Sequence, residues 1–168
     1  MEYTINKKPG FAVVGRQICV STVGGNQFQE IPEFWQQVME DGSFEQLAKE
    51  MSELGVMGIT LDYDEEAESI DYLIAIEKPA KNDAFQDLPD LVEAAIPAST
   101  WAVFTEKGPA TRISSIYQQI YQEWFTAVDF EHAGTPELEI YNIDHSTGEI
   151  SSFEIWIPIN NQDEIQKN

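Results

Sequence analysis

The chain has 168 residues, of which 42% are hydrophobic and 11% are aromatic, enough to bury the core of one domain. Nine basic residues stand against thirty acidic ones, and the net charge of −21 would repel phosphate backbones and anionic lipid. The N-terminus has no basic start followed by an apolar run, and no segment approaches the ~18 apolar residues that a membrane span needs. We therefore expect a cytoplasmic protein with no direct DNA binding and no membrane contact.

The cysteine and histidine content argues against metal and redox chemistry. Cys19 is the single cysteine, which excludes an internal disulfide, and its apolar neighbours predict that it packs in the core. His132 and His145 lack the spacing of a metal site and are expected in solvated loops. We expect no metal and no cofactor.

The predicted elements occur in the same order twice. In the first half we predict a strand at 11–14 and a polar loop at 22–29. Two amphipathic helices follow at 31–39 and 43–55, the second opened by a Ser43–Gln46 capping box. A β-hairpin with strands at 59–63 and 72–76 completes this half. A linker is expected at residues 78–89. In the second half we predict strands at 91–96 and 101–105 and a helix at 113–124. A second hairpin has its strands at 137–143 and 150–159.

The two halves also share a short sequence pattern. Residues 34–38 (FWQQV) match residues 116–120 (IYQQI) at a shift of 82 positions, and the same shift places Tyr72 on Glu154. We therefore predict an α+β fold in which a βαββ unit occurs twice, as pseudo-repeats at about 1–78 and 90–160 of a single domain spanning 1–168. Two such units related by a pseudo-twofold axis would leave a groove between them, where ligand pockets commonly form.

The last predicted strand carries the clearest functional signal. Alternation places one set of its side chains on an apolar face, which is expected under the helices: Phe153, Ile155, Ile157 and Ile159. The opposite face carries Ser152, Glu154 and Trp156. A carboxylate in a partly dry groove, with no fixed basic partner, favours a bound cation, and exposure of Glu154 to bulk water is the alternative.

Several strings of the sequence resemble a known family. The strings are EIWIPI at 154–159, PELEIY at 136–141, IPA at 96–98, WAVFTEKGP at 101–109, YQEWF at 121–125, KPGFAVVG at 8–15 and IPEFW at 31–35. Together they resemble the GyrI-like, AraC-type effector-binding domains, and the opening strings resemble the stand-alone integron-cassette effector-binding proteins in particular. Many members also carry an N-terminal helix-turn-helix domain, but this sequence starts directly with the effector module.

The resemblance implies both an architecture and a ligand. It implies two SH2-like βαββ units with antiparallel sheets and a central cleft, in which Glu154 faces a small, lipophilic organic cation. By position matching, Trp124 would line the cleft. Further candidate wall residues are Trp156, beside Glu154 on its strand, and Tyr72, Trp35, Phe104 and Tyr141. Ordinary core packing is the alternative for each aromatic residue.

Three functions are compatible with the sequence. The favoured one is a ligand-binding module, serving transcriptional regulation or sequestration, for which a protein partner and the oligomeric state stay open. A second is a hydrolase of strained electrophilic compounds, with Glu154 as general acid or base. A third is an acidic protein that inhibits a nucleic-acid enzyme through its net charge. We expect the protein not to be an enzyme.

Overall fold

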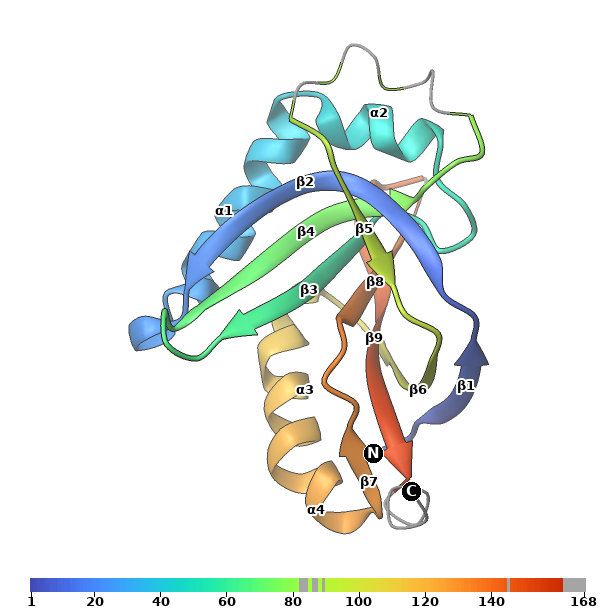
Figure 1. Cartoon of the computed structure of the whole chain (residues 1–168). Coiled ribbons are helices and arrows are strands. Elements are labelled where there is room, and N and C mark those ends of the chain that lie inside the picture. Colours follow the sequence, from blue (N-terminus) through green and yellow to red (C-terminus); the bar gives the residue numbers. More distant parts are fainter. Residues whose placement is uncertain (82–84, 86–87, 89, 145, 162–168) are drawn as a thin grey trace. The chain divides into compact units, whose positions relative to one another are not determined.

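The fold consists of two compact α+β units, shown in a computed structural model that describes residues 1–81, 85, 88, 90–144 and 146–161 (Figure 1). Unit 1 comprises Met1–Pro9 and Ala98–Asn168, and unit 2 comprises Gly10–Pro97. The chain passes between them at Pro9–Gly10 and again at Pro97–Ala98. The predicted pseudo-repeats of about 1–78 and 90–160 have different bounds: residues 1–9 belong to the unit of the second repeat, and residues 90–97 belong to the unit of the first.

Unit 2 has an antiparallel sheet with the strand order β3-β4-β2-β5. Its strands are β2 (Phe11–Ser21), β3 (Met57–Asp64), β4 (Ser69–Glu77) and β5 (Val92–Ile96). Its helices are the short 3-10 turn η1 (Val23–Gly25), α1 (Gln27–Glu40) and α2 (Ser43–Lys49). Phe34 and Val38 of α1 are buried against Val14, Ile74 and Ile76 of the sheet, as the helical spacing predicts.

The helix boundaries in unit 2 differ from the prediction. Helix α1 begins at Gln27, inside the predicted polar loop, and carries Pro32 within it. The predicted capping box is absent, because Gly42 precedes α2 and the backbone N–H of Ser43 donates to Asp41 Oδ1 instead (2.9 Å). An aspartate two residues before the helix thus caps its first turn in place of the serine.

Cys19 lies exposed on β2, so the prediction that it packs in the core is wrong. Its neighbour Val20 is buried and Ile18 packs against the core of unit 2. Successive side chains of a strand point to opposite faces, so one member of an apolar run must face away from that core.

Unit 1 has an antiparallel sheet with the strand order β1-β6-β9-β8, and β7 also pairs with β9. Its strands are β1 (Thr4–Lys8), β6 (Ser99–Lys107), β7 (Phe130–His132), β8 (Glu137–Ile143) and β9 (Ile150–Asn161). Its helical segment runs through η3 (Ala110–Arg112), α3 (Ile113–Gln119), the π-helical turn η4 (Ile120–Trp124) and α4 (Phe125–Ala127) (Figure 1). Strand β7 was not predicted, since three residues are too few for a periodic signal.

The helical segment of unit 1 covers the apolar face of β9, as predicted. Ile116, Ile120 and Trp124 form one buried cluster with the four inward residues of β9 and with two residues of β6. The cluster members on the strands are Phe153, Ile155, Ile157, Ile159, Ala102 and Phe104. On the other face of β9, Trp156 and Pro158 are also buried, Glu154 is partly buried and Asn160 is exposed.

Two predictions lie partly or wholly outside the described residues. They are the linker at 78–89, of which 82–84, 86–87 and 89 are not described, and the solvated loop position of His145. None of the described helices is both long and apolar enough to cross a membrane.

Candidate functional site

Glu154 lies on the face of the unit 1 sheet that points away from the helical segment. In the antiparallel register it stands opposite Ile140 of β8 and Thr105 of β6, whereas Ile155 stands opposite Glu139 and Phe104. The side chain of Glu154 is partly buried, between the buried Ile140 and the exposed Thr105. It is therefore neither fully solvated nor enclosed.

The carboxylate of Glu154 is held by a neutral donor. Trp156 Nε1 donates to Glu154 Oε2 at 2.8 Å, along the same face of β9. Within the described part of the chain, no lysine, arginine or histidine forms an ion pair with Glu154. The indole fixes the orientation of the carboxylate but leaves its negative charge uncompensated.

Two tryptophans lie on this face: Trp156 is next to Glu154, and Trp101 lies beyond Trp156, opposite Pro158 in the β6–β9 register. The rings of Trp156 and Trp101 meet edge to face, with centroids 5.8 Å apart. Trp101 is fully buried, and its Nε1 has no hydrogen-bond partner among the described residues. Aromatic faces of this kind supply apolar area and an electron-rich surface next to the carboxylate.

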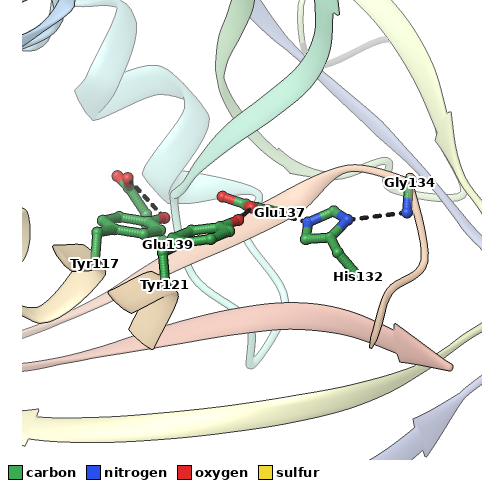
Figure 2. A network of polar contacts seen from close by, with 6 residues as sticks. All are labelled: Tyr117, Tyr121, His132, Gly134, Glu137 and Glu139. Atoms are coloured by element: carbon green, nitrogen blue, oxygen red, sulfur yellow. Dashed lines mark hydrogen bonds and ion pairs between the residues drawn. The ribbon is translucent and has the colours of Figure 1, made fainter. Parts of the chain in front are cut away.

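A second group of carboxylates lies on the helix-facing side of β8 (Figure 2). Glu139 accepts hydrogen bonds from Tyr117 of α3 (3.1 Å) and from Tyr141 of β8 (2.6 Å). Glu137, two residues earlier on the same face, accepts from the hydroxyl of Tyr121. We call Glu137, Glu139, Tyr117, Tyr121 and Tyr141 the tyrosine–carboxylate row.

The end of this row is anchored by His132. Its Nε2 lies 2.9 Å from Glu137 Oε1, and its Nδ1 accepts the backbone N–H of Gly134 (2.9 Å). Because Nδ1 accepts a hydrogen bond from Gly134, the ring hydrogen is on Nε2, which donates a hydrogen bond to the carboxylate. The prediction of a solvated loop histidine is therefore wrong for His132, which lies in β7 and bonds to Glu137.

The surroundings of Tyr121 raise the pKa of its hydroxyl and so favour the neutral phenol. Burial of its hydroxyl end is the main cause that raises the pKa of Tyr121, and the charge of Glu137 together with their hydrogen bond raises it further. The residue as a whole is 44% exposed, and its hydroxyl is bonded to Glu137. The phenol thus acts as a hydrogen-bond donor and not as a charged group.

Two predicted wall residues lie in the helix–sheet core of unit 1. Trp124 is 5% exposed and Phe104 is fully buried, and their rings pack edge to face with centroids 5.0 Å apart. Trp124 also contacts Tyr3, Phe125 and Phe130. Both lie on the opposite face of the sheet from Glu154, whereas Trp156 lies beside it.

Two further candidates, Trp35 and Tyr72, pair within unit 2. Trp35 Nε1 donates to the hydroxyl of the fully buried Tyr72 at 2.9 Å. Tyr72 faces the helix α1, so it corresponds to the helix-facing Phe153 and not to Glu154. The shift of 82 holds for the helices but fails by one residue in the last strands, and a one-residue slip reverses the face of a strand.

Sequence reasoning missed most of the tyrosine–carboxylate row. Of its members only Tyr141 was a predicted site residue. The available signal was the spacing: Glu137, Glu139 and Tyr141 alternate along a strand, and Tyr117 and Tyr121 stand one helical turn apart. Among the described residues, no cluster of acidic, histidine or cysteine side chains is suited to a metal ion.

Comparison with known proteins adds three similar folds and a family. Residues 4–159 match the family model described as integron-associated effector binding protein. The protein SAV2435, in a structure bound to tetraphenylphosphonium, is 19% identical with a TM-score of 0.81 over 98% of this chain and 97% of its own. A candidate transcription regulator from Staphylococcus aureus MU50 is 21% identical (TM-score 0.73, 96% and 99% covered). The integron cassette protein VCH_CASS2 of Vibrio cholerae is 15% identical (TM-score 0.69, 94% and 95% covered).

These structural likenesses fall below 25% identity, so they establish the fold, which is that of the GyrI-like effector-binding proteins. No curated protein matches the sequence.

Proposed function

This chain belongs to the family of integron-associated effector-binding proteins, and we propose on that premise that its effector is a lipophilic organic cation bound at Glu154. The observation that carries the proposal is a partly buried carboxylate whose contact is a neutral indole donor and which has no ion pair with a described residue. A ligand cation ~4 Å from this carboxylate would gain roughly 4 kcal/mol at an effective dielectric near 20, before desolvation.

The aromatic neighbours support a lipophilic ligand. Trp156 lies beside the carboxylate on the same face, and a cation against an indole gains about 0.5 to 2 kcal/mol. Tyr72, Trp35 and Tyr141 stay candidate walls on the strength of the family resemblance. Trp124 and Phe104 enter the proposal as the packing that holds the helix on β9, because their rings are buried in that core.

Tetraphenylphosphonium is the natural probe, since it is the ligand named in the structure of the similar protein SAV2435. We expect isothermal calorimetry to detect its binding to the wild-type chain and a thermal shift of about 5 to 10 °C at a hundredfold excess over Kd. Glu154→Gln keeps the shape and the acceptor for Trp156 but removes the charge. We expect it to weaken binding at least tenfold, which is about 1.4 kcal/mol.

Two controls separate charge at the site from general acidity. Glu149→Gln, at an exposed turn of the same hairpin, makes the same change in net charge and should leave Kd within twofold. Triphenylphosphine oxide, a neutral analogue, should bind much more weakly than the phosphonium. Equal affinity of wild type and Glu154→Gln for the phosphonium would rule out Glu154 as its counter-ion.

A further inference from the structure

Unit 1 has a hollow of about 590 Å³ at the end of its sheet remote from Glu154. It is lined by β1, by the start of β6, by the connection between β7 and β8, and by the end of β9. None of its ten lining residues is acidic, although 30 of the 168 residues of the chain are acidic. Two of the nine basic residues, Lys7 and Lys8, line it.

The lining is rich in hydrogen-bond donors. Lys7 stands opposite Thr100 in the β1–β6 register, and Lys8 stands opposite Ser99. Lys7 is exposed and forms no ion pair with a described residue, so its ammonium group is available. Asn160 of β9 adds a side-chain amide.

An unsatisfied hydroxyl provides independent support. Thr135 lines the hollow, and its Oγ1 is buried with no hydrogen-bond partner among the described residues. Buried hydroxyl groups normally have a partner, and an exception calls for a ligand or a water molecule at that point. Because this oxygen is itself buried, a rotation about the Cα–Cβ bond of Thr135 must turn it towards the hollow before a ligand oxygen there can complete the hydrogen bond.

We propose that this hollow binds the oxyanion group, carboxylate or phosphate, of a small molecule, at a site separate from that of the cation. The exposed ammonium group of Lys7 is the charged donor that such an anion requires, and the hydroxyl of Thr135 would add a second donor once its side chain turns towards the hollow. Glu154 lies five residues from Ile159, a lining residue of the same strand, which is roughly 17 Å at ~3.3 Å per residue. The protein would thus hold ligands of opposite charge at two places.

The test follows backbone amide signals of Thr100, Thr135 and Asn160 by NMR while inorganic phosphate and acetate are added in separate titrations. We expect saturable shifts at these amides with at least one anion, and the comparison of the two anions identifies the favoured class. Lys7→Gln should weaken binding about threefold to tenfold. Lys49→Gln, an exposed lysine of unit 2, makes the same charge change and should leave the affinity within twofold.

Thr135→Val tests the orphan hydroxyl. It keeps the shape of the side chain, so a threonine with a purely structural role would leave anion binding unchanged, whereas we expect at least threefold weaker binding and no loss of thermal stability. The absence of saturable shifts with both anions, or equal losses in Lys7→Gln and Lys49→Gln, would overturn the proposal. Glu154→Gln should leave anion binding within twofold, so failure of the cation site would not imply failure of this one.

Discussion

Units 1 and 2 place a strand, a helical segment and a hairpin in the same order, yet they treat charge differently. In unit 2 the basic side chain that faces the helices is paired: Arg16 meets Asp41 at 3.1 Å and Ser43 at 2.9 Å. In unit 1, Glu154 and Glu139 accept from the neutral donors Trp156, Tyr117 and Tyr141, although Glu106 pairs with Arg112 at 3.6 Å. Trp35 and Tyr117 occupy matching helix positions, but the first donates to a phenol and the second to a glutamate.

This difference indicates which charged groups are available to bind a ligand. An ion pair satisfies both charges within the fold and leaves nothing for a ligand, so the contacts of Arg16 serve structure. A carboxylate that accepts a hydrogen bond from a neutral indole keeps its negative charge, which is then available to a ligand cation. Under the proposed function, unit 1 supplies the charged contact to the ligand and the ion pair of unit 2 serves stability, and each of the following substitutions tests one side of that division.

The largest expected loss of stability comes from a substitution at Gly15 of unit 2, which we compare with the same substitution at Gly134 of unit 1. A Cβ at Gly15 of β2 would lie 2.0 Å from the backbone oxygen of Ile74, so the two strands would have to separate. We expect Gly15→Ala to lower the free energy of unfolding by about 3 kcal/mol, measured by urea denaturation. Gly134→Ala in unit 1 meets no atom within 4 Å but has φ +78, and should cost only about 1 kcal/mol.

The control for Gly15→Ala is to locate, by NMR, which part of the fold the substitution disturbs. Amide signals of β2, β4 and β5 should broaden or shift in Gly15→Ala, while those of α3 and β8 stay close to wild type. A loss in Gly15→Ala no greater than that in Gly134→Ala would show that the close approach of β2 and β4 is not a constraint on the fold.

A smaller effect is expected from removing one phenol hydroxyl in each unit. Tyr72→Phe takes the acceptor from Trp35 Nε1 at a position that is fully buried, so water cannot replace it. Tyr141→Phe takes one donor from Glu139, which is partly exposed and can bond to water instead. Thermal and urea unfolding should give losses of about 1.5 and about 0.5 kcal/mol, respectively. The division between the units fails if Tyr141→Phe is the more destabilising variant.

The sequence was sufficient for the parts of the fold that depend on periodicity. The spacing of Ile116 and Ile120 predicts the buried stripe of the unit 1 helix, and the alternation of β9 predicts which of its faces lies under that helix. The same alternation places Glu154 and Trp156 together, and the structure adds the hydrogen bond between them.

The rest required three-dimensional contacts. Tyr117 and Glu139 are 22 residues apart, and Tyr121 and Glu137 are 16 apart, so their pairing depends on how the helix lies over β8. Cys19 was misplaced because an apolar triplet does not indicate which residue of the strand faces outward. Tyr72 was aligned with Glu154 because a helix match was extended across loops of unequal length.

The smallest expected effect concerns the ion pair of unit 2 at low pH. The side-chain hydrogen bond with Ser43 is the main cause that holds the pKa of Asp41 below its ordinary value of 3.8, and the Ser43 backbone N–H and Arg16 lower it further against the opposing effect of burial. A carboxyl group with a lowered folded pKa stabilises the fold above its unfolded pKa. That contribution is lost as the pH falls through the folded pKa.

We therefore expect Asp41→Asn to lower the free energy of unfolding by only about 0.5 kcal/mol at pH 7, because the carboxylate is 36% exposed and solvent screens it. The difference from wild type should shrink below about pH 4 and vanish once the folded pKa has been passed. Glu65→Gln, at the exposed tip of the β3–β4 hairpin, is the matched control and should show no such pH dependence. If the difference between Asp41→Asn and wild type is the same at pH 7 and at low pH, the Arg16–Asp41 pair does not stabilise unit 2 through its charge, and the contrast with the carboxylates of unit 1 loses its electrostatic basis.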